Sequence, residues 1–158
     1  AKIVGLAAIK YGDLSNQATK DYIFDVDRFT SFEGNTGPYI LYTIVRIKSI
    51  LNRYVEAGGN LEAGEILPAS NGSEKNLMLQ LSGFGSMIES AFEEKAPHKI
   101  CAYIYEVSNA FNSFYHETKI LSEENQAQKE SYIRFLQLTK RVLETSIDLL
   151  GFEAPDKM

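Results

Sequence analysis

The sequence predicts an all-α protein that folds as a helical bundle. Three stretches, residues 38–54, 74–95 and 97–121, place apolar side chains at steps of three and four, which is the spacing of one helix face. A fourth stretch with this pattern runs from about Glu123 to Leu150. A chain of 158 residues suits one domain with a short appendage and is long enough to bury a core.

The first part of the chain predicts short elements. Residues 1–14 mix small and branched apolar residues and fit a short buried helix despite Gly5. Between residues 21 and 32 we expect an extended piece at Tyr22–Phe24 and a helical turn at Val26–Phe29. Three aspartates occur here, but a calcium loop also needs a bidentate glutamate and a glycine at its bend. Helix capping and solvation are therefore the favoured roles of Asp21, Asp25 and Asp27.

The central helix is expected to begin at Pro38, because proline is tolerated in the first turn, where its missing N–H has no intrahelical partner. A run without glycine or proline follows. At roughly 100° per residue, one arc of this helix is apolar and predicts its buried face. The residues of that arc are Ile40, Ile44, Ile47, Leu51, Tyr54 and Val55.

The opposite face of this helix carries aromatic and cationic side chains. Tyr39, Tyr42, Arg46 and Arg53 fall within an arc of roughly 60°, and Asn35 lies just upstream. No acidic residue occurs on this helix to balance its positive charges. Flat rings interleaved with guanidinium groups suit unstacked bases and their phosphates. The alternative is a solvated polar face whose tyrosines lie at the edge of the core.

The charge distribution matters more than the net charge of −5, which by itself argues against a general nucleic-acid binder. Residues 56–97 hold seven acids against Lys75 and Lys95 and account for the whole −5. The rest of the chain is neutral in sum and includes the positively charged central helix. The acidic loop at residues 56–73 suggests a second reading, a helical bundle that binds another protein.

The second half of the chain predicts three more helical stretches. Gly83 and Gly85 predict a kink or two abutting helices within residues 74–95. The helix from Pro97 to about Leu121 resembles a bundle seam. Ser122 is the expected cap of the last helix, and Gly151 ends it. The predicted core residues are Leu77, Leu81, Phe84, Ile88, Phe92, Ile100, Ile104, Val107, Phe111, Phe114, Leu136, Val142, Leu143, Ile147 and Leu150.

The remaining reactive side chains point to no catalytic site. His98 and His116 have no paired nucleophile or second ligand, and Cys101 is expected to pack as a small apolar residue. A single cysteine excludes an internal disulfide and fits a reducing cytoplasm. No apolar run approaches a membrane span, and the N-terminus does not resemble a signal peptide. A stand-alone hydrolase or metal enzyme is the weakest reading.

Several motifs together resemble arginyl-tRNA synthetases over almost the whole chain. The strongest is EGNTGPYILYTIVRIKSI, which is similar to the junction between the catalytic core and the helical anticodon-binding domain of that family. The others are IVGLAAIKYGDLS, PHKICAYIYEVSNAFNSFY and LLGFEAPDKM. The resemblance implies that residues 1–36 are the tail of the catalytic body, after the ATP-signature loop, and that residues 37–158 are the anticodon-binding domain. The same module from another class I synthetase, such as a cysteinyl enzyme, is the nearest alternative.

The resemblance implies a parent enzyme that ligates arginine to its tRNA with ATP and magnesium. The Lys-Met-Ser-Lys-Ser type loop and the His-Ile-Gly-His signature of class I synthetases do not occur here. We therefore expect this chain to be inactive alone and to hold no cofactor. Its expected partner is the anticodon loop of arginine tRNAs, with no membrane or DNA partner. A start without methionine suggests an excised piece, whose exposed 1–14 face would promote self-association.

The resemblance also implies which residues meet the RNA. Bases would lie against Tyr39, Tyr42 and Tyr115, while Arg46 and Arg53 hold backbone phosphates. Met158 takes the place of a terminal methionine that reaches the anticodon loop in the family, and Asn35 flanks the same site. At Lys119 some relatives carry an aromatic residue, so this chain departs from the pattern there and offers a phosphate contact instead. The predicted RNA-binding set is Asn35, Tyr39, Tyr42, Arg46, Arg53, Tyr115, Lys119 and Met158.

Overall fold

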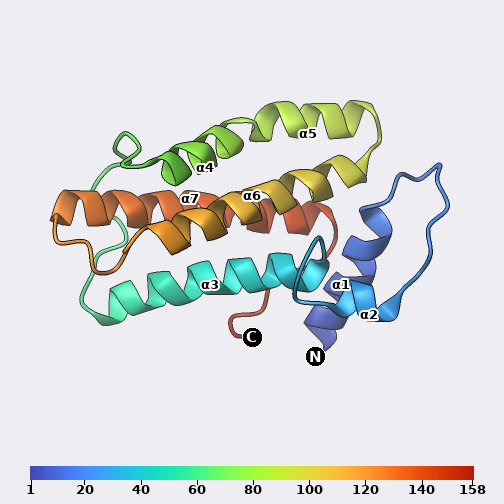
Figure 1. Ribbon diagram of the computed structural model, residues 1–158, viewed down its shortest axis with the longest axis horizontal. Helices are drawn as coiled ribbons and strands as arrows, with labels where there is room; N and C mark the ends of the chain where they lie inside the picture. Colours follow the sequence, from blue (N-terminus) through green and yellow to red (C-terminus); the bar gives the residue numbers. More distant parts are fainter.

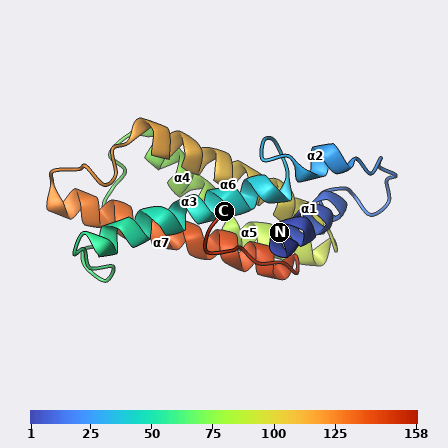
Figure 2. The ribbon, with the colours of Figure 1, turned by 90° about the horizontal axis from the view of Figure 1, so that it is seen from below.

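The computed structural model describes all 158 residues and contains seven helices and no strand. The predicted all-α class is therefore confirmed. Four helices form an elongated bundle: α3 (Gly37–Glu56), α4 (Gly72–Ser82), α6 (Pro97–Glu117) and α7 (Gln126–Leu149) (Figure 1). Helix α5 (Phe84–Glu93) continues from α4, while α1 (Lys2–Leu14) and α2 (Val26–Thr30) cover one end. Figure 2 shows the two chain ends near each other beside α3. None of these helices has the length and apolarity that a membrane crossing requires.

Helix α3 begins where the sequence predicts. The Thr36 hydroxyl accepts the Tyr39 backbone N–H at 3.2 Å, and Pro38 occupies the first turn. The apolar arc is buried as expected up to Tyr54, but the prediction for Val55 is wrong, since 47% of that side chain is exposed. Helix α3 packs against α1, α6 and α7 along most of its length, whereas Val55 lies in its last turn. Packing on several sides also buries Thr43, together with Leu41 and Ile50 outside the predicted arc.

The break within residues 74–95 is confirmed, because Gly83 separates α4 from α5. Leu77 and Leu81 are buried as predicted, and Phe84 is partly buried. The prediction for Phe92 is wrong, since this side chain is 84% exposed. Helix α5 packs mainly against α6 and lies at the edge of the bundle, so its far face meets solvent (Figure 1).

Helices α6 and α7 carry the predicted core residues, but α6 ends and α7 begins at residues other than those predicted. Helix α6 stops at Glu117, short of the predicted Leu121. Helix α7 is capped by Asn125, whose side chain accepts the Gln128 N–H at 3.0 Å, so the predicted start at Glu123 and the predicted Ser122 cap are wrong. The predicted apolar residues of both helices are buried, except that Ile100 is only partly buried. Gly151 ends α7 with φ +81°, as the sequence predicts.

The N-terminal segment forms the expected short helices. Asp25 caps α2 by accepting the Arg28 N–H at 3.1 Å, which agrees with its predicted capping role. In α1, Tyr11 is fully buried, but Leu6 and Ile9 are 46% and 56% exposed. The expected burial of this helix holds for Ala7, Ala8 and Tyr11, while Leu6 and Ile9 form an exposed apolar side, which was also expected for residues 1–14. Residues Tyr22–Phe24 are not helical and pair with no other strand.

The loop at residues 57–73 is confirmed as non-helical except at its end, where α4 begins, and it is held against α7. The Gln137 side chain donates to the Leu61 carbonyl at 2.8 Å, and the Leu67 N–H donates to the Ser131 hydroxyl at 2.9 Å. The carboxylate of Glu62 lies 3.3 Å from Arg134 of α7. One of the two carboxylates within this loop is thus already engaged inside the molecule.

Candidate nucleic-acid interface

The site centres on Arg46, which lies between two tyrosine rings. Its guanidinium carbon Cζ is 4.8 Å from the ring centroid of Tyr42 on the same helix. It is 4.9 Å from the centroid of Tyr115 on α6. Both rings stay partly accessible, with exposed fractions of 42% for Tyr42 and 37% for Tyr115. The packing of α3 against α6 thus brings together three residues predicted for the interface and lines them up as an aromatic–guanidinium–aromatic cluster.

Hydrogen bonds hold the Arg46 side chain in this position. Its Nη1 donates to Asn112 Oδ1 of α6 at 2.8 Å, and its Nη2 donates to the Tyr42 hydroxyl at 3.0 Å. The Asn112 amide donates in turn to the Tyr39 hydroxyl at 2.9 Å, and that hydroxyl donates to Asn109 Oδ1 at 2.7 Å. A chain of polar contacts therefore fixes the orientation of the planar guanidinium group before any ligand arrives.

Asn109 and Asn112 were missed by reasoning from the sequence. A signal for them exists, because Asn109, Asn112 and Tyr115 follow one another at steps of three along α6 and so share a face of that helix. That face looks polar in isolation. Only the packing of α6 against α3 shows that it meets Tyr39 and Arg46.

The electrostatics leave the charge of Arg46 uncompensated. None of the ion pairs in the structure includes Arg46, and its hydrogen-bond partners are all neutral. Burial raises the pKa of the neighbouring Tyr39 above its ordinary value of 10.0, so this hydroxyl stays a neutral donor at physiological pH. A partly buried guanidinium with no carboxylate partner is suited to bind an anionic group such as a phosphate.

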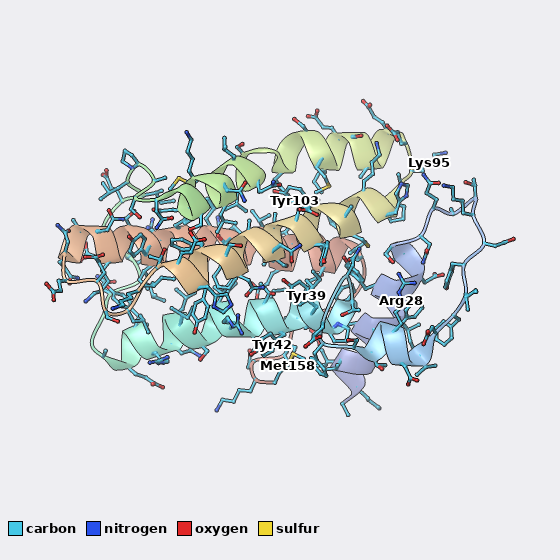
Figure 3. All side chains as sticks on the ribbon, in the orientation of Figure 1. Arg28, Tyr39, Tyr42, Lys95, Tyr103 and Met158 are labelled. Carbon is cyan, nitrogen blue, oxygen red and sulfur yellow. The ribbon has the colours of Figure 1, made fainter.

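Met158 lies beside this cluster, where the C-terminal tail folds back along α3. It lines a groove of about 580 Å³ together with Tyr42 and Phe32, and Figure 3 shows Met158 next to Tyr42. The tail is held by Lys48, whose Nζ lies 3.4 Å from the carbonyl oxygens of Ala154 and Pro155. The structure thus gathers five of the predicted residues in one region: Tyr39, Tyr42, Arg46, Tyr115 and Met158.

Three of the predicted residues lie outside the cluster. Asn35 precedes α3, and its Oδ1 accepts a hydrogen bond from the buried Tyr11, which gives it a structural contact. Arg53 lies roughly two turns beyond Arg46 on α3 and lines a separate hollow with Lys129. Lys119 follows the end of α6 and lines a hollow whose other residues include Glu123 and Glu124. The carboxylates beside Lys119 reduce its attraction for phosphate.

No group of three or more histidine, cysteine, aspartate or glutamate side chains lies close enough together to hold a metal ion. Cys101 is buried and unpaired, and burial raises the pKa of its thiol to about 12. This agrees with its predicted role as a small apolar residue, since a thiol with this pKa is not a nucleophile at neutral pH.

The comparisons with known proteins agree with the all-helical fold. The profile of the DALR anticodon binding domain matches residues 40–158. This chain belongs to the DALR anticodon binding domain family. The match begins at Ile40, within α3, so the predicted division of the chain at residue 36 stays a prediction.

The most similar relatives include two bacterial proteins named arginine–tRNA ligase. The protein from Agathobacter rectalis is 70% identical over 100% of this chain, and the one from Alkaliphilus oremlandii is 57% identical over 98% of it. The chain spans 27% and 26% of the length of these relatives, about a quarter of each. The predicted resemblance to arginyl-tRNA synthetases is therefore confirmed.

Solved structures lead to the same family. The arginyl-tRNA synthetase of Thermus thermophilus aligns over 99% of this chain and 27% of its own, with a TM-score of 0.89 at 29% identity. That of Plasmodium falciparum aligns over 97% of this chain and 27% of its own, with a TM-score of 0.85 at 30% identity.

Proposed function

We propose that this chain binds the anticodon loop of arginine tRNAs, as part of a longer enzyme that ligates arginine to its tRNA with ATP. The observation that carries the proposal is the Tyr42–Arg46–Tyr115 cluster on an accessible face of a domain of the DALR family. The two rings offer flat apolar surface to splayed bases, and the guanidinium between them offers positive charge to the phosphates that join those bases.

The contacts of Arg46 favour a stacked arrangement in which bases take the outer faces of the rings. Arg46 already covers one face of Tyr42 and one face of Tyr115. Phe111 lies against Tyr115 as well, at a ring-centroid distance of 6.1 Å, which leaves Tyr42 as the more open of the two platforms. We propose that Asn35, Arg53 and Lys119 add peripheral contacts to the backbone on either side of the cluster.

We further propose that the adenylation chemistry, with ATP and magnesium, takes place in a catalytic body outside residues 1–158. The two signature motifs of class I synthetases that handle ATP do not occur in this sequence. Residues 1–36 would then connect that body to the anticodon-binding domain, in the cytoplasm, where tRNA is charged. The protein-binding alternative based on the acidic loop finds no specific support, because that loop is held against α7.

The test is fluorescence-anisotropy binding of the 158-residue chain to a labelled anticodon stem-loop of an arginine tRNA, with a scrambled loop as control. Loop-selective binding that weakens as salt is raised supports the proposal, because phosphate contacts release counterions. Arg46→Lys should weaken binding, since lysine lacks the planar fork that contacts Asn112 and Tyr42 together. Equal binding of both loops over the whole salt range would refute the proposal for this chain.

We also propose that the isolated chain self-associates through α1. Leu6 and Ile9 expose 46% and 56% of their side chains on this helix, an apolar surface open to a second copy. A concentration series by light scattering tests this. The molar mass should rise with concentration and return to that of a monomer in Leu6→Glu; a monomer at every concentration would show the surface to be inert.

A further inference from the structure

We propose that a groove beside α7 binds an acidic amphipathic helix of a partner protein, in which carboxylates flank a stripe of aliphatic side chains. This inference goes beyond the proposed RNA binding and does not depend on it. The groove lies between α7, the end of α3 and the loop that joins α3 to α4 (Figure 1), and its volume is about 480 Å³. Its rim is basic, so it selects the opposite partner charge from the acidic loop considered above.

On α7 the groove follows one face of the helix. Its lining includes Arg134, Leu138, Arg141 and Thr145, which follow one another at steps of four, three and four. From Arg134 to Thr145 the helix rises about 17 Å, or three turns. A helical face with this spacing normally packs against another helix, but here Leu138, Arg141 and Thr145 are exposed. A partner helix of about three turns therefore fits along α7.

Aliphatic side chains form the floor of the groove. Leu138 of α7 and Ile66 of the loop expose 40% and 46% of their surface, while Leu51 of α3 is buried and Leu61 is partly buried. No aromatic ring lines the groove, so a nucleobase would find no ring on which to stack. Aliphatic side chains from a protein match this floor better than bases do.

The rim of the groove is positively charged. Arg134, Lys140 and Arg141 line it together with one carboxylate, Glu144, which already lies 3.6 Å from Lys140 and 3.4 Å from Lys48. Arg141 takes part in none of the ion pairs of the structure. An apolar partner would bury this guanidinium without a counter-charge, and a basic partner would repel it. An acidic partner supplies the carboxylate that Arg141 lacks.

The wall opposite α7 is held in place by hydrogen bonds. The Leu61 carbonyl accepts from Gln137 Nε2 at 2.8 Å and from Arg134 Nη1 at 3.3 Å, and the Leu67 N–H donates to the Ser131 hydroxyl at 2.9 Å. The groove therefore exists before a partner arrives, which lowers the ordering cost of binding. Because the Leu61 carbonyl is engaged by side chains, an extended peptide cannot pair with it, which favours a helix as the occupant.

The groove is separate from the candidate RNA site. Tyr42, Arg46 and Tyr115 do not line it. Arg46 and Leu51 are five residues apart on α3, which places them roughly 140° apart around that helix. A partner protein in the groove and RNA at the Arg46 cluster would therefore occupy different faces of the bundle.

The test is fluorescence-anisotropy binding of the 158-residue chain to a labelled synthetic helix of about 14 residues, or about four turns. Leucines at steps of three and four form the apolar face of this peptide, and glutamates flank them. A second peptide with lysine in place of each glutamate is the control. The glutamate peptide should bind about tenfold more tightly than the lysine peptide, and this preference should fall as salt is raised.

Two substitutions test the floor and the rim separately. Leu138→Glu places a carboxylate among the aliphatic side chains, and Arg141→Glu reverses the unpaired charge. Each should weaken binding of the glutamate peptide about tenfold. The controls Leu149→Glu and Lys129→Glu make the same changes on α7 outside the groove and should bind within about twofold of the parent. Far-UV circular dichroism should match the parent in all of these variants, because none of the four side chains belongs to the core.

Equal binding of the two peptides, or parent-like binding by Leu138→Glu or Arg141→Glu, would show that the groove takes no acidic helix. The anticodon stem-loop should bind both groove variants within about twofold of the parent, since charges on another face are screened. If both variants lose the stem-loop about tenfold, the groove belongs to the RNA surface and the assignment to a protein is wrong. If Leu138→Glu by itself lowers the molar mass of the chain in light scattering, a second copy fills the groove and the assignment fails.

Discussion

Replacing Asn112 by aspartate should separate the role of Arg46 in binding from any role in stability. The substitution keeps the shape of the side chain but places a carboxylate 2.8 Å from Arg46 Nη1, where the amide oxygen now accepts. The new ion pair would neutralise the guanidinium that we expect to meet a phosphate. The substitution also removes the amide donor to the Tyr39 hydroxyl, and an ion pair at this partly exposed site adds little stability, so the free energy of unfolding should fall by about 1–2 kcal/mol.

The substitution should also weaken RNA binding. Losing one charge-assisted contact to phosphate costs about 1.5 kcal/mol, or about tenfold in affinity at low salt. The slope of log K against log salt should shrink by about 0.7, the contribution of one phosphate of a single strand. Anisotropy titrations at several salt concentrations measure both quantities, and urea unfolding measures stability.

Asn109→Asp is the matched control for Asn112→Asp. It adds the same charge one turn earlier on α6, next to the Tyr39 hydroxyl, and has no hydrogen bond to Arg46. Asn109→Asp should therefore weaken binding of the anticodon loop several-fold less than Asn112→Asp does. If Asn112→Asp binds the loop with the affinity and salt slope of the parent, Arg46 is not a phosphate ligand and the placement of the RNA strand is wrong.

Three further predictions concern the Tyr42 ring, the C-terminal tail and the buried hydroxyl of Tyr103. Tyr42→Ala should cost about 1–3 kcal/mol of loop binding in anisotropy titrations, and parent-like affinity would rule out stacking there. Lys48→Met should free the C-terminal tail, so that limited proteolysis removes Met158 faster and binding of the anticodon loop weakens. The control Lys140→Met loses only an ion pair with Glu144 and should change neither the proteolysis rate nor the binding. Burial raises the pKa of Tyr103 to about 12 from 10.0, so its contribution to stability is present below pH 10 and is lost as pH rises through 12. Urea unfolding should show this decline weakened in Tyr103→Phe, and an identical decline in both proteins would contradict it.

The main elements of the fold could be predicted because they depend on local patterns. Pro38 and the apolar steps after it predict α3, and Gly83 predicts the break between α4 and α5. The errors fall where an element lies at the edge of the bundle. Phe92 follows the apolar period of its helix but meets solvent, because no element covers the outer side of α5. The N-cap of α7 is Asn125 and not the predicted Ser122, because both residue types are good caps and the local sequence does not decide between them.

In the candidate site, too, some features follow from the local sequence pattern and others depend on tertiary packing. The sequence by itself determined the tyrosine and arginine face of α3, since residues four and seven apart on a helix share a face wherever that helix lies. Only the tertiary structure decided that Tyr115 covers Arg46, that Asn112 holds it, and that Met158 lies beside Tyr42. These contacts join residues far apart in sequence, and their geometry depends on how α3, α6 and the C-terminal tail pack. A helical period specifies which face of a helix is polar but not which other segment that face meets.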